Sequence, residues 1–266
     1  MSEKRDVQFY QEVMDICLTA GRLMIEGGSE MYRVEDTMLR IARNAGIDDP
    51  RVFATPTCVF MSLDGGKLSQ MKQIRDRNIN LELVDRVNDL SRQFAVKKIT
   101  LSELKEKIAL VSQAPTFPMW LQVLGAAVLS ATLMVLFMDN YDWVDFPGAA
   151  LVGAVGFWSY YEFKKYTKIR FLSELIAAMV MGILAVLFNH FNPQMITDNI
   201  LIGALMTLVP GLAITNALRD LFMGDLLSGI MRMCEAVLTA LALGGGVALV
   251  LKFIGCLLYT SDAADD

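Results

Sequence analysis

The sequence has few of the residues on which enzyme and metal sites depend. Its single histidine, His190, lies in the apolar half of the chain, so the polar half has no Ser-His or Cys-His pair. No CxxC pair or other metal-ligand spacing occurs among its cysteines, which are Cys17, Cys58, Cys234 and Cys256. We interpret the cysteines as small apolar residues in a reducing environment, and predict no catalytic residue, disulfide framework, metal or cofactor.

Positive charge is also scarce. The net charge is −5, and no run of basic residues is longer than two. These values argue against the basic surface that nucleic-acid binding requires. The first twenty residues are charged and amphipathic, so we predict no cleavable signal peptide.

Apolar residues are abundant but unevenly distributed. They make up 54% of the chain, and the mean hydropathy is +0.43. Residues 1–118 carry 17 basic and 17 acidic side chains, whereas long apolar runs dominate the remainder. This contrast predicts a small soluble α+β domain over residues 1–118 and a polytopic membrane domain over residues 119–255. Residues 256–266 resemble a translated sequencing adapter, so we expect them to be a non-native tail.

The soluble part shows helical and strand patterns in turn. Apolar residues at three- and four-residue steps predict helices over 6–26, 30–45, 81–96 and 101–113. Ser29 and Thr100 are the expected N-caps of the second and fourth of these helices. A β-branched and aromatic stretch over 52–63, the turn at 64–66 and a second strand over 67–74 predict a hairpin.

A dense polar group follows the first helix. It consists of Ser29, Glu30, Arg33, Glu35 and Asp36. Glu30 and the nearby Glu26 could act as paired carboxylates in an enzyme, but helix caps and surface ion pairs explain them as well. We therefore favour a structural interpretation and treat the group as a cytoplasmic motif.

Five apolar segments of the second part are long enough to cross about 30 Å of hydrocarbon. They cover residues 119–138, 146–162, 171–189, 198–217 and 234–254. Small residues such as the pair Ala149 and Gly153, and the run of glycines at 244–246, predict close helix packing.

The loop charges predict the orientation of these segments. Aspartates occupy the first loop, at Asp139, Asp142 and Asp145, and basic residues the second, at Lys164, Lys165, Lys168 and Arg170. The third loop has no basic residue, and the fourth has Arg219 and Arg232. Basic loops face the cytoplasm, so the N-terminal domain is predicted to be cytoplasmic, in a cell (inner) membrane protein.

The fourth segment combines a helix break with polar residues. Pro210 and Gly211 should interrupt a helix about 18 Å from its outer end, near the middle of the bilayer. Discontinuous helices at this depth recur in transporter substrate sites. Arg219 could bind a substrate carboxylate, or it could pair with an acidic residue, Asp220, Asp225 or Glu174, and hold the bundle together. The predicted substrate site comprises Pro210, Gly211, Thr215, Asn216, Arg219, Asp220 and Asp225.

Several blocks resemble the threonine/serine exporter family. They are residues 27–36, residues 55–63 with the hairpin that follows, residues 79–82 and 87–91, and the most specific block, 210–229. The resemblance implies an inner-membrane exporter of small hydrophilic metabolites, with threonine and serine or dicarboxylates such as succinate as substrates. It also implies a second small multi-helix membrane protein as partner. Many members carry His-Gly where this chain has Gly27-Gly28, so a role for that histidine does not transfer.

These observations leave several hypotheses. The leading one is a subunit of a secondary exporter for threonine and serine, embedded in lipid and forming an oligomer with its partner. The alternatives are a dicarboxylate (succinate) exporter subunit, a regulatory subunit whose cytoplasmic domain senses a metabolite, and a membrane-anchored hydrolase. The hydrolase is least favoured because the sequence pairs no nucleophile with a base.

Overall fold

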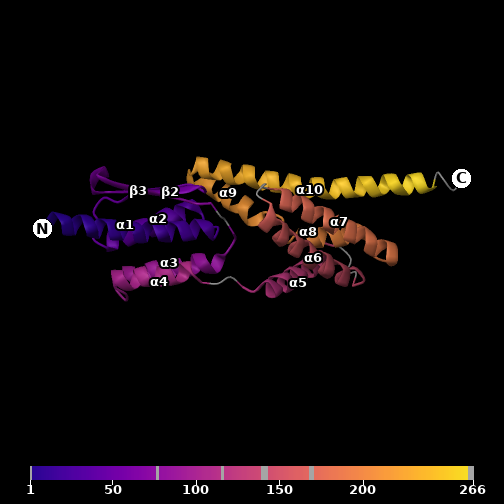
Figure 1. Ribbon diagram of the computed structural model, residues 1–266, viewed down its shortest axis with the longest axis horizontal. Helices are drawn as coiled ribbons and strands as arrows, with labels where there is room; N and C mark the ends of the chain where they lie inside the picture. The colour runs from indigo at the N-terminus through magenta and orange to yellow at the C-terminus, as the bar shows by residue number, and fades with distance from the viewer. Residues whose placement is uncertain (1, 76–77, 115–116, 139–142, 168–170, 263–266) are drawn as a thin grey trace. The chain divides into compact units, whose positions relative to one another are not determined.

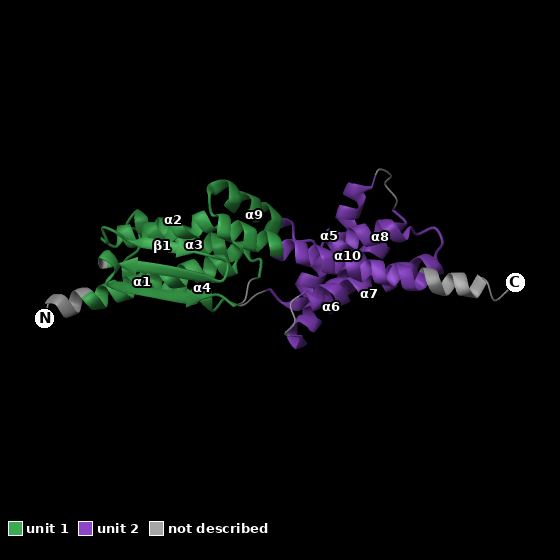
Figure 2. Cartoon of the chain, turned by 90° about the horizontal axis from the view of Figure 1, so that it is seen from above, with its two compact units in different colours: residues 1–115, 212–234 green, residues 116–211, 235–266 purple. Residues whose placement is uncertain are grey.

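The computed structural model of the chain describes residues 2–75, 78–114, 117–138, 143–167 and 171–262. Its contacts divide the chain into two units, which are described separately (Figure 2). The first unit contains residues 1–115 and 212–234, and the second contains residues 116–211 and 235–266. Residues 212–234, which the sequence analysis placed in the membrane domain, therefore make their contacts with the N-terminal domain.

The first unit is an α+β domain to which a helical segment is added. Its elements in chain order, most of them labelled in Figure 1, are α1 (Ser2–Glu26), α2 (Met31–Asn44), β1 (Arg51–Ala54), β2 (Cys58–Leu63), η1 (Asp64–Gly66), β3 (Leu68–Gln73), α3 (Leu81–Ala95) and α4 (Leu101–Ser112). The strands form an antiparallel sheet in the order β1-β2-β3. The helix α1 packs against α2, α3, α4 and the sheet, so it forms the centre of the unit.

The sheet differs from the prediction in one respect. The stretch 52–63 was expected to be one strand, but it forms β1 and β2, which pair with each other. Between them, Thr55 Oγ1 accepts a hydrogen bond from the backbone N–H of Cys58 at 3.1 Å and donates one to its carbonyl at 3.0 Å. The predicted turn at 64–66 is confirmed, and Gly65 and Gly66 both adopt positive φ, at 62° and 98°.

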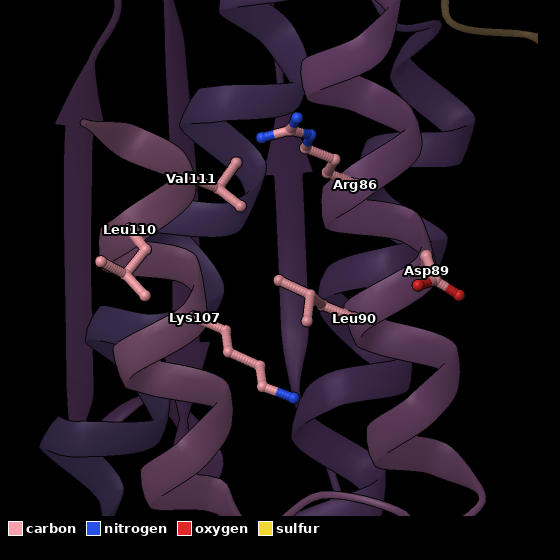
Figure 3. Close-up of a pocket in the computed structure, with 6 residues that line it drawn as sticks. All are labelled: Arg86, Asp89, Leu90, Lys107, Leu110 and Val111. Atoms are coloured by element: carbon pink, nitrogen blue, oxygen red, sulfur yellow. The ribbon is translucent and has the colours of Figure 1, made fainter. Parts of the chain in front are cut away.

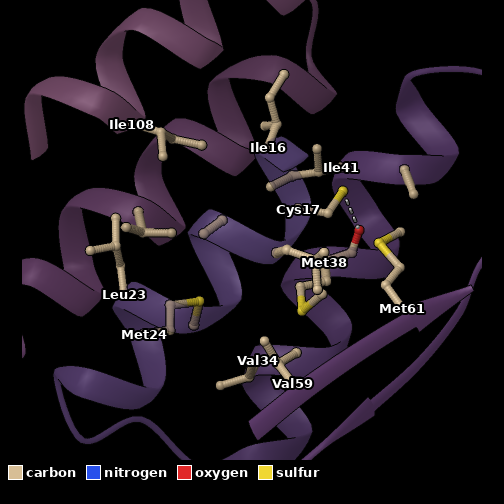
Figure 4. Close-up of a cluster of buried hydrophobic side chains, with 14 of the residues drawn as sticks. Ile16, Cys17, Leu23, Met24, Val34, Met38, Ile41, Val59, Met61 and Ile108 are labelled. Atoms are coloured by element: carbon tan, nitrogen blue, oxygen red, sulfur yellow. Dashed lines mark hydrogen bonds between the residues drawn. The ribbon is translucent and has the colours of Figure 1, made fainter. Parts of the chain in front are cut away.

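The core of the first unit lies between the helices α1 to α4 and one face of the sheet (Figure 4). Val59, Met61 and Leu63 alternate along β2 and are fully buried on this face. Cys17 is buried in the same core and donates its thiol to the Met38 carbonyl at 3.6 Å. Burial raises the pKa of the Cys17 thiol far above its usual value, so this cysteine packs as an apolar residue.

The ends of α1 and α2 show a second correction. The backbone turns at Gly28, which has a φ of 89°. Ser29 was predicted to cap α2, but the N-cap residue is Glu30, and its side chain makes no capping hydrogen bond. The cap of α4 is confirmed, because Thr100 and Glu103 form a capping box.

The second unit is helical. It contains α5 (Met119–Phe137), α6 (Asp145–Tyr166), α7 (Leu172–Phe191), α8 (Thr197–Leu205) and most of α10 (Leu226–Asp262). Among the described residues, three helices are long and apolar enough to cross a membrane, namely α5, α7 and residues 226–254 of α10. The chain is therefore a helical membrane protein, and the segment predicted at 146–162 forms α6 without meeting the same criterion of length and composition.

Small residues bring the helices of this unit together, as the sequence predicted. The helix α6 packs against α5, α7 and α8, and its Ala149 is fully buried. A Cβ added at Gly153 would lie 1.8 Å from Ser130 Oγ on α5. Asp145, which was expected in a loop, begins α6, is buried and accepts hydrogen bonds from Ile196 N at 2.9 Å and Asn199 Nδ2 at 2.8 Å.

The fourth apolar segment is split and then forms a helical hairpin. The helix α9 (Gly211–Met223) follows α8 after the predicted break, and α10 begins two residues after the turn at Gly224, whose φ is 94°. Residues 218–233 were expected to be a loop, but most of them belong to α9 and α10. The predicted tail is helical up to Asp262, and residues 263–266 lie outside the described residues.

Candidate functional site

The interruption at Pro210 is confirmed. The last regular turn of α8 ends at Leu205, and α9 begins at Gly211. Between them, Thr207 donates its hydroxyl to the Ala204 carbonyl at 2.8 Å, and Gly211 N donates to the Val209 carbonyl at 2.8 Å. Proline has no N–H to continue the helical ladder, so the break follows directly from the sequence.

Asn216, Arg219 and Asp220 on α9 contact the turn between α1 and α2. Asn216 Nδ2 donates a hydrogen bond to the Gly28 carbonyl at 2.8 Å. The Arg219 guanidinium forms an ion pair with Glu30. Asp220 Oδ1 accepts a hydrogen bond from the backbone N–H of Met31 at 3.0 Å. Residues of the predicted substrate site and of the predicted cytoplasmic motif are therefore in direct contact. The sequence analysis had treated them as two separate sites.

Two residues of α10 complete this contact. Arg232 donates to the Ser29 carbonyl, and its Nε lies 3.4 Å from Asp220 Oδ2. Ser228 donates its hydroxyl to the Ala54 carbonyl at 3.3 Å. Both residues were missed by the sequence analysis, although their spacing of four residues on a helix places them on one face. We call Asn216, Arg219, Asp220, Ser228 and Arg232 the hairpin face.

The carboxylates of the contact differ in electrostatic environment. Burial raises the pKa of Glu30, but hydrogen bonding and the charges of Arg33 and Arg219 outweigh it, so the net shift is downward. For Asp220, burial raises the pKa and the nearby Arg232 only partly opposes it. No hydrogen bond from the described residues reaches Asp220 Oδ2, which agrees with this upward shift.

Glu35 and Asp225 extend the contact, whereas Asp36 and Thr215 bond to residues of their own helices. Glu35 accepts a hydrogen bond from Ala54 N at 2.8 Å, and burial, followed by the charge of Asp225, raises its pKa. Asp36 instead pairs with Arg40 on the exposed side of α2. Thr215 is exposed and donates to the Leu212 carbonyl at 3.1 Å.

The ion pair of Arg219 settles one question that the sequence left open. Arg219 does pair with an acidic residue of the chain, but that residue is Glu30 and not one of the three that the sequence suggested. The Arg219 side chain nevertheless stays 56% exposed, whereas the Glu30 side chain is only 7% exposed. The Arg219 side chain is therefore ion-paired and still more than half exposed to solvent.

A shallow, open pocket of about 260 Å³ lies elsewhere in the first unit, between α3 and α4 (Figure 3). Its lining combines two basic, one acidic and three aliphatic side chains, which are Arg86, Lys107, Asp89, Leu90, Leu110 and Val111. None of these residues belongs to the predicted site. Within the described part of the chain, no group of three or more His, Cys, Asp or Glu residues is placed to hold a metal ion.

Comparison with known families identifies the chain. Residues 15–254 match the family described as "Putative threonine/serine exporter". The chain belongs to this family. The family description is that of a membrane exporter and not of an enzyme, in agreement with the three apolar helices and with the sequence analysis.

Members with curated names come from bacteria and yeasts. The Escherichia coli (strain K12) protein "Probable succinate transporter subunit YjjP" is 23% identical over 252 residues, which cover 91% of this chain and 95% of that protein. The Candida albicans (strain WO-1) protein "Pheromone-regulated membrane protein 10" is 24% identical over 260 residues, which cover 95% of this chain and 23% of that protein. No solved structure matches the chain.

Proposed function

We propose that the chain is a subunit of a secondary exporter that moves small hydrophilic metabolites, threonine and serine, out of the cytoplasm. The family membership supports export, and the interrupted helix before α9 supports a substrate site. The observation that carries the proposal is the group of polar residues on α9. There, Asn216 offers an amide and Arg219 a guanidinium on a half-exposed side chain, and both are donors suited to a carboxylate.

The proposed topology has five spans in the inner membrane, with the N-terminal domain in the cytoplasm. The apolar helices α5, α7 and α10 supply three spans, and the segments 146–162 and 198–217 would supply the others. The orientation rests on the alternation of loop charges. Several of these charges, Asp139, Asp142, Lys168 and Arg170, lie outside the described residues.

A dicarboxylate such as succinate is the second candidate substrate. The bacterial relative is named as a subunit of a succinate transporter, and this name also supports a partner subunit for the present chain. A second guanidinium, that of Arg232, lies on the same hairpin face as Arg219. A substrate with two carboxylates is bound better by two guanidinium groups than by one. As partner we propose a small multi-helix membrane protein of the same family, in an oligomer.

The test is an efflux assay with the full chain and its partner. Arg219→Ala and Asn216→Ala should each abolish efflux of the true substrate and leave membrane insertion intact. Arg51→Ala is a matched control, because Arg51 is exposed on β1 and pairs with Asp49. Threonine, serine and succinate are compared side by side with each variant. Normal efflux of all three from both Arg219→Ala and Asn216→Ala would refute the proposed site.

A further inference from the structure

We propose that Glu30 is an internal carboxylate ligand of Arg219, which the exported substrate must displace. The segment 28–30 would then act as a gate over the hairpin face. This inference rests on the proposed function and adds two things to it, a residue that determines specificity and a way to control access. The substrate class that it selects is any small molecule whose carboxylate competes with that of a glutamate.

The first argument is chemical complementarity. Three successive residues of the segment present acceptors to the hairpin face, which are the carbonyls of Gly28 and Ser29 and the carboxylate of Glu30. The groups that bind them are all donors, namely one amide and two guanidinium groups. A carboxylate substrate would use the same donors, so the segment and the substrate compete for one set of partners.

The second argument is that Glu30 has an alternative partner. Its Oε2 lies 3.2 Å from Arg33 Nη1, whereas its Oε1 binds Arg219. When Glu30 leaves Arg219, it therefore keeps a counter-charge within its own segment. A buried carboxylate without any counter-charge would be costly, and this second pair removes most of that cost. The free-energy change on exchanging the Glu30 carboxylate for a substrate carboxylate at Arg219 is then small.

The third argument is that Arg219 can be reached. More than half of its side chain is exposed while the ion pair is in place. A substrate carboxylate can therefore approach the exposed part of the Arg219 side chain before Glu30 leaves it. Such a stepwise exchange avoids a state in which the arginine has no partner.

The fourth argument is that the segment is anchored on its other side. Asn78 N donates to the Glu26 carbonyl at 3.0 Å, and Asn80 N donates to the Gly27 carbonyl at 3.0 Å. A Cβ added at Gly27 would lie 2.8 Å from Val84 Cγ2 and 2.9 Å from the Asn80 carbonyl. The base of the segment is thus fixed, so Glu30 would return to Arg219 when the substrate leaves.

Two substitutions test this gate through opposite effects on transport. Glu30→Gln removes the competing charge and should lower the half-saturating concentration of the true substrate, on the order of tenfold if the gate is closed about nine-tenths of the time. Arg33→Ala removes the alternative partner of Glu30 and should raise that concentration. Glu12→Gln makes the same charge change at an ion pair with Lys105 and is the control. A loss of packing alone would not shift the half-saturating concentrations of these two variants in opposite directions.

A second measurement follows the gate without transport. Ser29 is 2% exposed, so the variant Ser29→Cys should react slowly with a maleimide while the segment is in place. Tryptic cleavage after Arg22 and Arg33 puts position 29 in a peptide that has no other cysteine, so mass spectrometry reads it alone. The reaction should accelerate when Glu30→Gln is added. It should also accelerate when threonine, serine or succinate is added to the chain that retains Glu30.

The outcomes separate the gate from the proposed substrate. Unchanged labelling in the Glu30→Gln background overturns the gate, whatever the transport assay gives. Normal transport with an unchanged half-saturating concentration in both variants overturns the competition. If Glu30→Gln accelerates labelling, none of the three compounds does, and none is transported, the contact stands and the proposed substrate class is wrong. If labelling responds to one compound and the half-saturating concentrations shift as expected, the proposal holds for that compound.

Discussion

Asp220 on α9 accepts a hydrogen bond from the backbone N–H of Met31 at 3.0 Å, across 189 positions of sequence. Met31 is the first residue of α2, and the preceding Glu30 makes no side-chain cap of its own. The Asp220 carboxylate therefore acts as the N-cap of α2 and places a negative charge at the positive end of this helix. The hairpin face and the first α+β elements depend on each other for stability.

We expect Asp220→Ala to destabilise the chain strongly. The substitution removes the cap of α2 and one ion-pair partner of the Arg232 side chain, which is 10% exposed. Loss of one partner of a buried pair costs roughly 3–5 kcal/mol of unfolding free energy. Thermal unfolding of the detergent-solubilised chain measures the effect. Asp220→Asn keeps an acceptor for Met31 N and should therefore destabilise the chain less. If Asp220→Ala is as stable as the unsubstituted chain, the capping role is contradicted.

The environment of Glu35 predicts a pH dependence of the chain's stability that can be separated from the contributions of other carboxyl groups. Burial raises the pKa of Glu35 above the usual 4.5, the hydrogen bond from Ala54 opposes this shift, and the charge of Asp225 adds to it. Folding therefore favours the protonated form. Its contribution to stability is complete below pH 4.5 and is lost as the pH rises through the pKa of the folded state.

Glu35→Gln should remove this dependence, because glutamine keeps the acceptor for Ala54 N and carries no charge. The melting temperature of the variant should exceed that of the unsubstituted chain at neutral pH, and the difference should shrink toward zero as the pH falls to 4.5. Asp36→Asn makes the same change in charge at the neighbouring exposed position and serves as the control. A difference that is constant with pH, or that grows in acid, would contradict the upward shift.

The elements of the chain follow from local signals in the sequence. Apolar periodicity predicted α1 to α4 with their ends displaced by a few residues, and Thr100 correctly predicted the start of α4. Proline and glycine at 210 and 211 predicted the break before α9, because the missing N–H acts within the chain's own ladder. Such features depend on neighbours in sequence, so a single sequence contains them.

The contacts of the candidate site could not be predicted in this way. Glu30 and Arg219 are 189 residues apart, and nothing local links a turn of the soluble domain to a helix counted as a membrane span. The amphipathic spacing of Ser228 and Arg232 was present in the sequence, but residues 218–233 were interpreted as a loop because of their polarity. A polar stretch between apolar helices can be a loop, or a helix whose polar side meets another domain, and composition does not distinguish the two.

The last prediction concerns two glycines of α10, Gly244 and Gly246, for which substitution by alanine should have different effects on stability. A Cβ added at Gly246 would lie 2.6 Å from the Leu175 carbonyl and 2.8 Å from Ala178 Cβ, both on α7. At Gly244, no atom of the described residues lies within 4 Å of the added Cβ. Gly246→Ala therefore forces the two helices apart, at a cost of roughly 1–3 kcal/mol, which exceeds the gain in helix propensity of about 1 kcal/mol.

Gly244→Ala gains the same propensity without the clash and should be neutral or stabilising. The comparison is matched in residue type, in helix and in depth, because the two positions are two residues apart. Thermal unfolding in detergent gives the sign of each effect. Equal effects of the two substitutions would show that α10 does not approach α7 at Gly246, and that the run of three glycines serves something other than helix packing.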